Sequence, residues 1–335
     1  GSYYGTLTDC TISGNTANQN GGGSYGGTLT DCTISGNTAN QNGGGAYYGI
    51  LTGCVISNNV TTLYDGGGTH SSTVTNCTIS GNTANRNGGG SYYGTLTDCT
   101  ISGNTANRDG GGSRSGTLTG CTISGNTANE NGGGSAYGTL TDCVISGNTA
   151  NRGGGTCYSV VYNSAIYNNT ATVLWGALAR GKYYNCTIYS NTAPDYAVGD
   201  ANGHASEPAI YNCVIYGNVN TGPNTRQLQV PLGGIFYCSS IDSVDKFSLG
   251  VNTPTVFPVY GDPQFTDPLN NDFTLLPKSP CINKGANQYV TTATDLLGSP
   301  RIKDWRVDMG AYESQSTRFV TTPNALYPMG TKELQ

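Results

Sequence analysis

The sequence predicts an all-β protein: a single-stranded, right-handed parallel β-helix (β-solenoid) of about eleven turns of roughly 22 residues, with a C-terminal cap. Three observations predict this fold: a repeated unit, columns of apolar residues, and bend residues at fixed positions. The unit is clearest over residues 21–42, GGGSYGGTLTDCTISGNTANQN, and its cysteine recurs every 22 or 23 residues from Cys10 to Cys143. Units this short cannot bury a core alone, so they must stack on one another. The right hand is expected because most parallel β-helices have it.

Each turn is expected to contain three short strands and three bends. With the cysteine as position 0, position +2 is isoleucine in ten turns. Residues two apart on a strand point to the same face, so the cysteine and the isoleucine are both expected to point inward. The apolar position −3, from Leu7 to Ile235, has the opposite parity, so a bend must separate it from the cysteine. Position −1 is Asp, Asn or Gly, position +4 is Gly or Asn, and the GGG triplet marks the third bend; these residues tolerate a left-handed backbone. The glycine content and the β-branched runs disfavour helices.

Position +5 is asparagine in ten turns, which predicts a structural ladder. A stacked amide donates to the turn on one side and accepts from the turn on the other, which satisfies polar groups at a buried bend. In the regular repeats the ladder comprises Asn15, Asn37, Asn59, Asn82, Asn104, Asn126 and Asn148.

The cysteine column has two interpretations. Stacked thiols act as small hydrophobic groups, or neighbouring turns form disulfides, since their Cα atoms lie within bonding range. Parallel Cβ vectors favour thiols. No CxxC motif or histidine partner accompanies the column, so we predict no metal site and no cofactor. Cys157 lies outside the column at a variable, outward position, and is predicted to be an exposed thiol.

The repeat degrades along the chain, which predicts four regions. Residues 1–155 form regular turns, 156–258 degenerate turns with longer loops, 259–315 the cap, and 316–335 a tail. The tail contains the strand-like RFVTT, and we expect it to dock on a neighbouring subunit, so that head-to-tail contacts build a filament.

Composition excludes two kinds of partner. The net charge of −5 and the pI near 4.9 argue against nucleic acid, which binds basic surfaces. No apolar stretch approaches the ~18 residues of a membrane-spanning helix.

Residues 262–313 contain a detailed motif, DPQFTDPLNNDFTLLPKSPCINKG followed by TDLLGSPRIKDWRVDMGAYE. This segment resembles the C-terminal part of secreted bacterial right-handed β-helix proteins, including choice-of-anchor Q domain proteins; the repeats more loosely resemble those of polymorphic outer-membrane proteins. Cys281 and Asn283 depart from the pattern, which usually has alanine and aspartate. The resemblance implies a secreted or cell-surface solenoid. Separately, the charged residues Asp295, Arg301, Asp308 and Glu313 are predicted to be structural, pairing with each other or with turn amides.

Three functions remain open. The favoured one is an extracellular structural or adhesive solenoid without enzymatic activity. A carbohydrate-active enzyme, a polysaccharide lyase or a glycosidase, would use a polar cluster in or beside the long loop of the later turns: Arg180, Lys182, Asp195, Asp200, His204 and Glu207. A glycan-binding surface would use outward tyrosines on one strand edge: Tyr3, Tyr25, Tyr47, Tyr92 and Tyr137. The simpler interpretation of the tyrosines is packing between turns, and we favour it.

Overall fold

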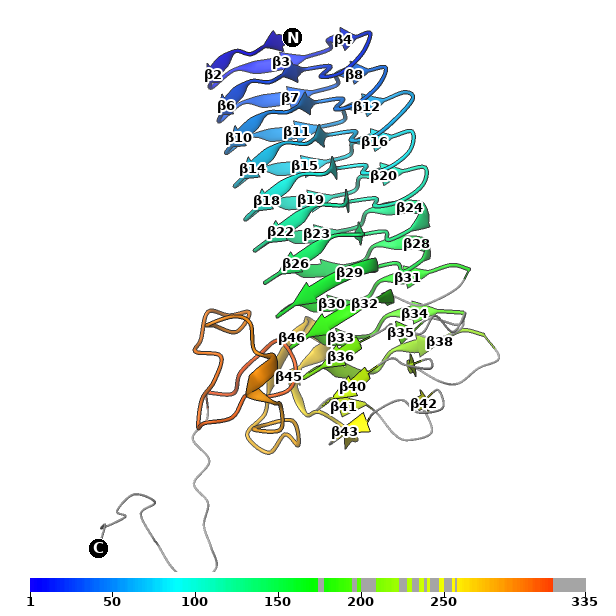
Figure 1. Ribbon diagram of the computed structural model, residues 1–335, viewed down its shortest axis with the longest axis vertical. Helices are drawn as coiled ribbons and strands as arrows, with labels where there is room; N and C mark the ends of the chain where they lie inside the picture. The colour runs from blue at the N-terminus through cyan, green and yellow to red at the C-terminus, as the bar shows by residue number, and fades with distance from the viewer. Residues whose placement is uncertain are drawn as a thin grey trace, which may run out of the picture.

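The computed structural model is an elongated parallel β-helix whose turns stack in register (Figure 1). It describes residues 1–173, 178–194, 198–199, 209–222, 228–230, 235–237, 240–241, 247–249, 255–256 and 258–315. In these residues, helix is confined to two short 3-10 segments, η2 (Pro268–Asn270) and η3 (Asn287–Tyr289). None of the helices that this part of the chain forms has the length and apolar character needed to cross a membrane.

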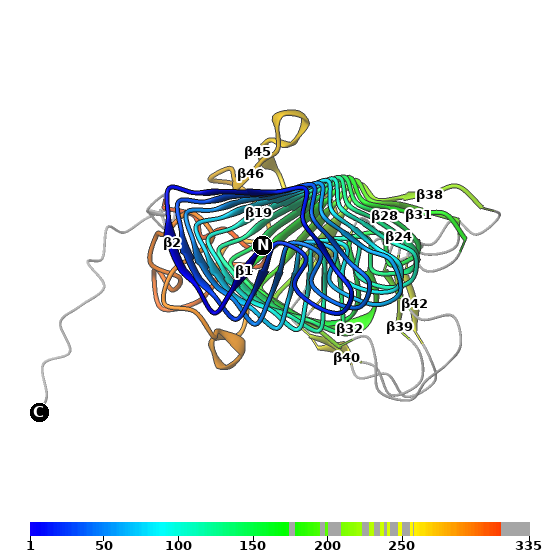
Figure 2. The ribbon, with the colours of Figure 1, turned by 90° about the horizontal axis from the view of Figure 1, so that it is seen from above.

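Three parallel sheets form the faces of the solenoid, and Figure 2 shows them in cross-section through β2, β19 and β24. Sheet A, the largest, contains 22 strands, two from each regular turn: β1 (Ser2–Tyr3), β2 (Thr6–Thr8), β5 (Ser24–Tyr25), β6 (Thr28–Thr30), β9 (Ala46–Tyr47), β10 (Ile50–Thr52), β13 (Thr69–His70), β14 (Thr73–Thr75), β17 (Ser91–Tyr92), β18 (Thr95–Thr97), β21 (Ser113–Arg114), β22 (Thr117–Thr119), β25 (Ser135–Ala136), β26 (Thr139–Thr141), β29 (Thr156–Tyr162), β32 (Leu178–Tyr184), β35 (Val198–Gly199), β36 (Ala209–Tyr211), β39 (Leu228–Val230), β40 (Ile235–Tyr237), β42 (Phe247–Leu249) and β43 (Thr255–Val256).

The other two faces each take one strand per turn. Sheet B contains twelve: β3 (Thr11–Ser13), β7 (Thr33–Ser35), β11 (Val55–Ser57), β15 (Thr78–Ser80), β19 (Thr100–Ser102), β23 (Thr122–Ser124), β27 (Val144–Ser146), β30 (Ala165–Tyr167), β33 (Thr187–Tyr189), β37 (Val214–Tyr216), β41 (Ser240–Ile241) and β44 (Val259–Tyr260). Sheet C contains ten: β4 (Thr16–Ala17), β8 (Thr38–Ala39), β12 (Val60–Thr61), β16 (Thr83–Ala84), β20 (Thr105–Ala106), β24 (Thr127–Asn131), β28 (Thr149–Arg152), β31 (Thr170–Ala171), β34 (Thr192–Ala193) and β38 (Val219–Asn220). The number of turns therefore differs slightly from the predicted eleven.

The three predicted bends are present, but each regular turn also has a fourth. Positions −1 and +4 are left-handed, as in Asp31 (φ 51°) and Gly36 (φ 62°), and so is the first glycine of the triplet, as in Gly43 (φ 66°). The fourth left-handed residue splits sheet A into two strands per turn, for example at Tyr48 (φ 53°). The prediction of three strands was incomplete because tyrosine rarely adopts this conformation.

The core consists of the predicted columns. In the second turn Leu29, Cys32 and Ile34 are 0–1% exposed, and their counterparts continue the same buried cluster along the rod. The predicted register of one later turn was wrong by a residue, because Ile210 pairs with Phe236 and not with Ile235.

The asparagine ladder is confirmed. The Asn104 side chain donates from Nδ2 to the Asn126 Oδ1 and to the Ile79 carbonyl, both over 2.9 Å. Its Oδ1 accepts from the backbone N–H and the Nδ2 of Asn82, each over 2.9 Å. The same pattern repeats along the column, so one buried side chain per turn links three successive turns.

The segment 261–315 lies against the flank of the solenoid, beside β33 and β36 (Figure 1), whereas Val259–Tyr260, expected to belong to the cap, form β44 of sheet B. The segment contains an antiparallel pair, β45 (Phe265–Asp267) and β46 (Asp272–Leu275). Three asparagines at position −1 donate to its carbonyls: Asn163 to Thr294, Asn185 to Tyr289 and Asn212 to Ala286, over 3.0–3.1 Å. The contacts described here are lateral, so the expected closure of the last turn stays a prediction.

The later turns are modified where this segment docks. Along sheet B, position +3 is serine in the regular turns, as in Ser146, and tyrosine in the next two turns. The strands pair Ser146 with Tyr167 and Tyr167 with Tyr189. Both rings lie 5.2 Å from the Phe273 ring between centroids, and Phe273 is buried. The loss of repeat regularity therefore creates an aromatic docking surface.

Charged residues hold the segment's own turns together. Buried Arg301 pairs with Glu313 over 3.5 Å and donates to the Gly310 carbonyl. Asp295 accepts from the backbone N–H of Glu313 over 2.9 Å, and Asp308 from that of Ser314 over 2.7 Å. These contacts agree with the structural role predicted for the four residues.

Candidate functional site

The polar cluster proposed for catalysis is only partly described. Asp195, Asp200, His204 and Glu207 lie outside the described residues. Arg180 and Lys182 lie on β32. Lys182 is exposed, whereas the Arg180 guanidinium lies 4.9 Å from the centre of the Tyr158 ring and donates to the Tyr158 hydroxyl. Arg180 is therefore held by an aromatic partner on the preceding turn.

The tyrosines form two adjacent columns on sheet A, which together we call the tyrosine strip. In the inner column, strand register aligns Tyr3, Tyr25, Tyr47, His70, Tyr92, Arg114, Ala136 and Cys157. The outer column is one residue further on in each turn: Tyr4, Gly26, Tyr48, Ser71, Tyr93, Ser115, Tyr137, Tyr158 and Arg180. Tyr137 therefore does not align with Tyr3, Tyr25, Tyr47 and Tyr92 as predicted, because Ala136 occupies their column.

The inner column packs between turns, as the favoured interpretation of the tyrosines expects. The Tyr3 and Tyr25 rings are stacked at 5.4 Å between centroids, and Tyr25 and Tyr47 lie 5.2 Å apart. Tyr25 and Tyr47 are half-buried, and burial raises the pKa of Tyr47 to about 12. Burial likewise lowers the pKa of His70, against the opposing charge of Asp65, to about 4. The imidazole is therefore neutral at neutral pH and continues the stack as an aromatic ring.

The outer column is different because its tyrosines are exposed. The exposed fraction is 64% for Tyr4, 57% for Tyr48 and Tyr93, and 43% for Tyr137. These four occupy every second turn, separated by Gly26, Ser71 and Ser115. A turn rises by ~4.8 Å, so the exposed rings recur at intervals of roughly 10 Å. Each has a left-handed backbone, as in Tyr93 (φ 52°), which is uncommon for a bulky residue.

Small residues in the outer column leave room for these rings. A Cβ atom added to Gly26 would collide with the Tyr4 ring, so Tyr4 leans across the turn that follows it. The Tyr48 ring stands edge-on to Tyr47, with ring centroids 4.4 Å apart. Tyr4 and Tyr93 likewise stand edge-on to Tyr3 and Tyr92 of the inner column. The Tyr137 ring is stacked instead on Tyr158 of the outer column, with ring centroids 4.8 Å apart.

Arg114 links the two columns. Its guanidinium lies 5.5 Å from the centre of the Tyr92 ring and 5.0 Å from that of Tyr137. Nη1 donates to the Tyr92 hydroxyl over 3.2 Å, and Asp109 lies 3.5 Å from Nε. The strip therefore contains a cation that is held in place by two rings and a carboxylate.

The cysteines are thiols in all described positions, and the prediction for Cys157 was wrong. Cys157 is 0% exposed and packs with Ala179 and Tyr158. In these later turns small residues replace the inner-column tyrosines, and the small side chains are buried. Cys10 is the partly exposed thiol among the described cysteines. The hydrogen bond with the Cys143 thiol, together with burial, raises the pKa of Cys121 to about 12. Buried protonated thiols fit the interpretation as small hydrophobic groups.

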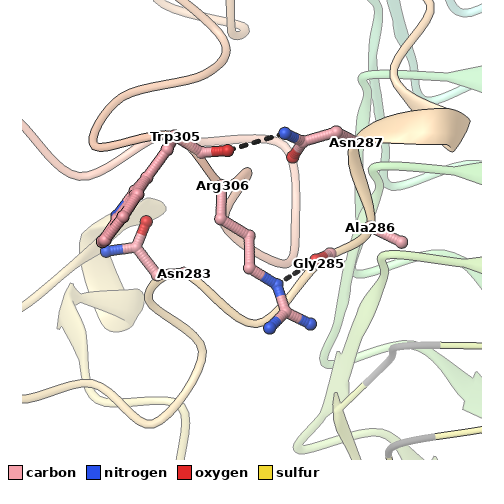
Figure 3. Close-up of a pocket in the computed structure, with 6 residues that line it drawn as sticks. All are labelled: Asn283, Gly285, Ala286, Asn287, Trp305 and Arg306. Carbon is pink, nitrogen blue, oxygen red and sulfur yellow. Dashed lines mark hydrogen bonds between the residues drawn. The ribbon is translucent and has the colours of Figure 1, made fainter. Parts of the chain in front are cut away.

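A pocket of about 600 Å³ lies in the flank segment, lined by Asn283, Gly285, Ala286, Asn287, Trp305 and Arg306 (Figure 3). The Trp305 indole is 75% exposed. The Arg306 Nε donates to the Gly285 carbonyl over 2.7 Å, and the Asn287 Nδ2 to the Trp305 carbonyl over 2.7 Å. Sequence reasoning missed this pocket because the segment was interpreted only as a cap. The one sequence signal that could have pointed to it was Trp305, a tryptophan between charged residues in RIKDWRVDMG.

Within the residues that the structure describes, no group of three or more His, Cys, Asp or Glu side chains is close enough to hold a metal ion. The thiol column faces the apolar core, and each thiol donates to backbone carbonyls, as Cys99 does to Thr97 over 3.2 Å.

The fold and the strip define a class: a parallel β-solenoid repeat protein with an aromatic surface and a laterally docked C-terminal segment. The chain belongs to the NosD family, described as periplasmic copper-binding protein (NosD), whose model matches residues 51–221, a little more than half of the chain. No curated protein matches the chain significantly. Among solved structures, a crystal structure of the pectate lyase Pel9A is similar over 93% of this chain and 87% of that chain, with 14% sequence identity and a TM-score of 0.47.

Proposed function

We propose that this protein is a structural and adhesive solenoid of the extracytoplasmic space, at the cell surface or secreted, which holds a glycan chain along the outer column of the tyrosine strip. The observation behind the proposal is the left-handed backbone of the exposed Tyr4, Tyr48, Tyr93 and Tyr137. Gly26, Ser71 and Ser115 occupy the same position, so the fold does not require tyrosine there. Strained backbone at bulky exposed residues points to a role for the side chain itself.

A glycan fits the chemistry of the column. Sugar rings present C–H faces that pack on aromatic rings and hydroxyls that bond to the phenol groups. Rings at roughly 10 Å intervals meet an extended polymer repeatedly, so weak contacts add up by multivalency. Arg114 supplies a charged hydrogen-bond donor beside Tyr137.

The location is supported by the family description, which names a periplasmic protein. The resemblance of residues 262–313 to choice-of-anchor Q segments supports a secreted or surface protein. Copper is not part of the proposal, because the described donor groups do not fit it: buried thiols bonded to backbone carbonyls and isolated acids do not form a coordination set.

The experiment compares the wild-type protein with the triple variant Tyr48→Ser, Tyr93→Ser, Tyr137→Ser on a glycan array, followed by co-sedimentation with the polysaccharide that scores highest. Serine occurs naturally in the column, so the variant should fold. Each ring contact contributes ~0.5–1.5 kcal/mol, so affinity should fall at least about ten-fold. The matched control is Tyr260→Ser, an exposed tyrosine outside the strip. Equal binding by the triple variant, or no glycan bound by the wild type, would reject the proposal.

Self-association is a separate part of the proposal. Residues 316–335, expected to dock on a neighbouring subunit, lie outside the described residues. Deletion of residues 316–335 should abolish filaments in electron micrographs; filaments of unchanged length after deletion would show that the tail has no part in assembly.

A further inference from the structure

We infer that the pocket of the flank segment binds an acidic sugar: a hexuronate ring stacked on Trp305, with its carboxylate bound by Arg306. The site is independent of the tyrosine strip, because the two are built by different parts of the chain. Its volume of about 600 Å³ lies within the range of small-molecule sites, which typically combine an aromatic wall with a few oriented polar groups.

Trp305 supplies the wall. Two consecutive left-handed residues, Asp304 (φ 52°) and Trp305 (φ 71°), direct the indole away from the segment's core and leave it 75% exposed. The backbone at this point is held in place, because the Trp305 carbonyl accepts the 2.7 Å hydrogen bond from Asn287. Asn287 is itself fixed, since its Oδ1 accepts from the Val307 N–H over 2.9 Å. A large aromatic ring kept in solvent by a fixed, strained turn is suited to stacking on a ligand.

Arg306 supplies the positive charge. Its Nε donates to the Gly285 carbonyl over 2.7 Å and its Nη2 to the Lys284 carbonyl over 3.3 Å. Guanidinium has five N–H donors. Both Nη1 hydrogens and one Nη2 hydrogen remain. One hydrogen on each of these two nitrogens points end-on, and such a pair binds a carboxylate in bidentate fashion. Within the described chain Arg306 has no acidic partner, so its orientation is fixed by neutral carbonyls and its charge is not neutralised.

Asn283 supplies a group for sugar hydroxyls. Its backbone N–H donates to Asp308 over 2.6 Å, which fixes the residue, and its side-chain amide lies beside the indole (Figure 3). An amide both donates and accepts, as a hydroxyl does. The amide of Asn283 carries no negative charge that would repel a carboxylate.

The test is isothermal titration calorimetry with two probes, a tetramer of a hexuronic acid and its methyl ester, which has the same rings without the charge. All proteins compared carry the Tyr48, Tyr93 and Tyr137 serine changes, so the contribution of these three rings is removed. The acid should bind at least about ten-fold more tightly than the ester, as a charged hydrogen-bond pair contributes. Arg306→Gln should bring the affinity for the acid down to that of the ester, and Trp305→Ala should weaken both.

The matched control is Leu297→Ala, an exposed apolar residue of the same segment outside the pocket, which should bind like its parent. Equal affinity for acid and ester, an unchanged affinity in Trp305→Ala, or no binding by the parent would overturn the inference. If Arg306→Gln weakens the ester as much as the acid, the charge assignment is overturned. Failure of the strip in the glycan experiment does not affect this result, since Tyr48, Tyr93 and Tyr137 are serine in every protein compared here.

Discussion

Asn212 and Ala286 exchange two hydrogen bonds: the Asn212 side chain donates to the Ala286 carbonyl over 3.0 Å and accepts from the Ala286 N–H over 2.8 Å. The side-chain amide thus imitates a backbone peptide and joins the flank segment to the solenoid. Asn212 also donates to the Asn185 Oδ1 over 2.9 Å, so the bends of two turns are linked to the same segment. Ala286 lines the pocket, and the docking therefore positions the proposed site.

Changing Asn212 to Asp should loosen the flank segment. A carboxylate cannot donate to the Ala286 carbonyl and leaves this half-buried group without that partner, at a cost of ~1–3 kcal/mol. The free energy of unfolding in urea should fall by this amount, and a protease should cleave residues 259–315 faster. Asn76→Asp is the control, because Asn76 occupies the same bend position but is exposed. Equal losses for the two variants would refute the proposed docking role of Asn212.

Changing Asn104 to Ala should interrupt the ladder. The variant leaves the Ile79 carbonyl and the Asn82 N–H without their 2.9 Å partners inside the core. We expect a loss of ~2–3 kcal/mol in the free energy of unfolding, measured in urea. The control is Asn107→Ala, which removes an exposed 3.2 Å hydrogen bond to Asn85 and should change stability by less than ~0.5 kcal/mol. A small effect at Asn104 would mean that the ladder does not stabilise the rod.

Changing Gly111 to Ala should be strongly destabilising. An added Cβ would lie 2.5 Å from the carbonyl oxygens of Gly133 and Thr127, so successive turns would have to separate at a cost of ~1–3 kcal/mol. Gly103→Asn is the control. Gly103 is left-handed (φ 61°) with open space around it, and Asn58 occupies the equivalent position naturally. Thermal melts should separate the two variants, and similar melting temperatures would contradict the close packing of the triplet.

The stability of the flank segment should depend on pH through Glu313. Burial and the neighbouring Asp308 raise the pKa of Glu313 from 4.5 to about 8. Between these values the folded protein keeps a proton that the unfolded chain has lost, so stability falls as pH rises through this window and levels off above it. The melting temperature should therefore decrease from about pH 5 to about pH 8 in wild type.

Glu313→Gln is the control for this dependence. The amide does not titrate, so the decrease should be shallower than in wild type. The same slope in both proteins would show that Glu313 keeps an ordinary pKa and that other groups cause the pH effect.

Much of the fold could be predicted because the relevant interactions repeat. The ladder at Asn37 and Asn59, the core column at Ile34 and the bend at Asp31 each depend on a residue meeting its own copy one turn away. A period of 22 residues therefore determines the partner without knowledge of the rest of the chain. The same logic failed for Ile235. Cys213 and Cys238 are 25 residues apart, and alignment on these two cysteines places Ile235 opposite Ile210, whereas the strands pair Ile210 with Phe236.

The candidate sites could be predicted only in part. The tyrosines were noticed on one strand edge, yet the left-handed residue that forms the outer column was not, so Tyr137 was grouped with the tyrosines of the inner column. Cys157 was expected to be exposed because it replaces the outward residues of other turns, Tyr25, Tyr47 and Tyr92, but it packs with Ala179 and Tyr158. The pocket around Trp305 could not be derived, because its walls come from two separate stretches, residues 283–287 and 305–306, that meet only through the turns of the flank segment.

The sequence alone determined a stacked solenoid, its columns of cysteine and isoleucine, its bends and its ladder, because these are contacts between identical residues at one period. Only the tertiary structure decided where residues 258–315 lie, which tyrosines are packed and which exposed, and how Arg306 and Trp305 form a pocket. These depend on contacts between unlike residues, some of them as far apart in the chain as Asn212 and Ala286, and no period specifies such partners.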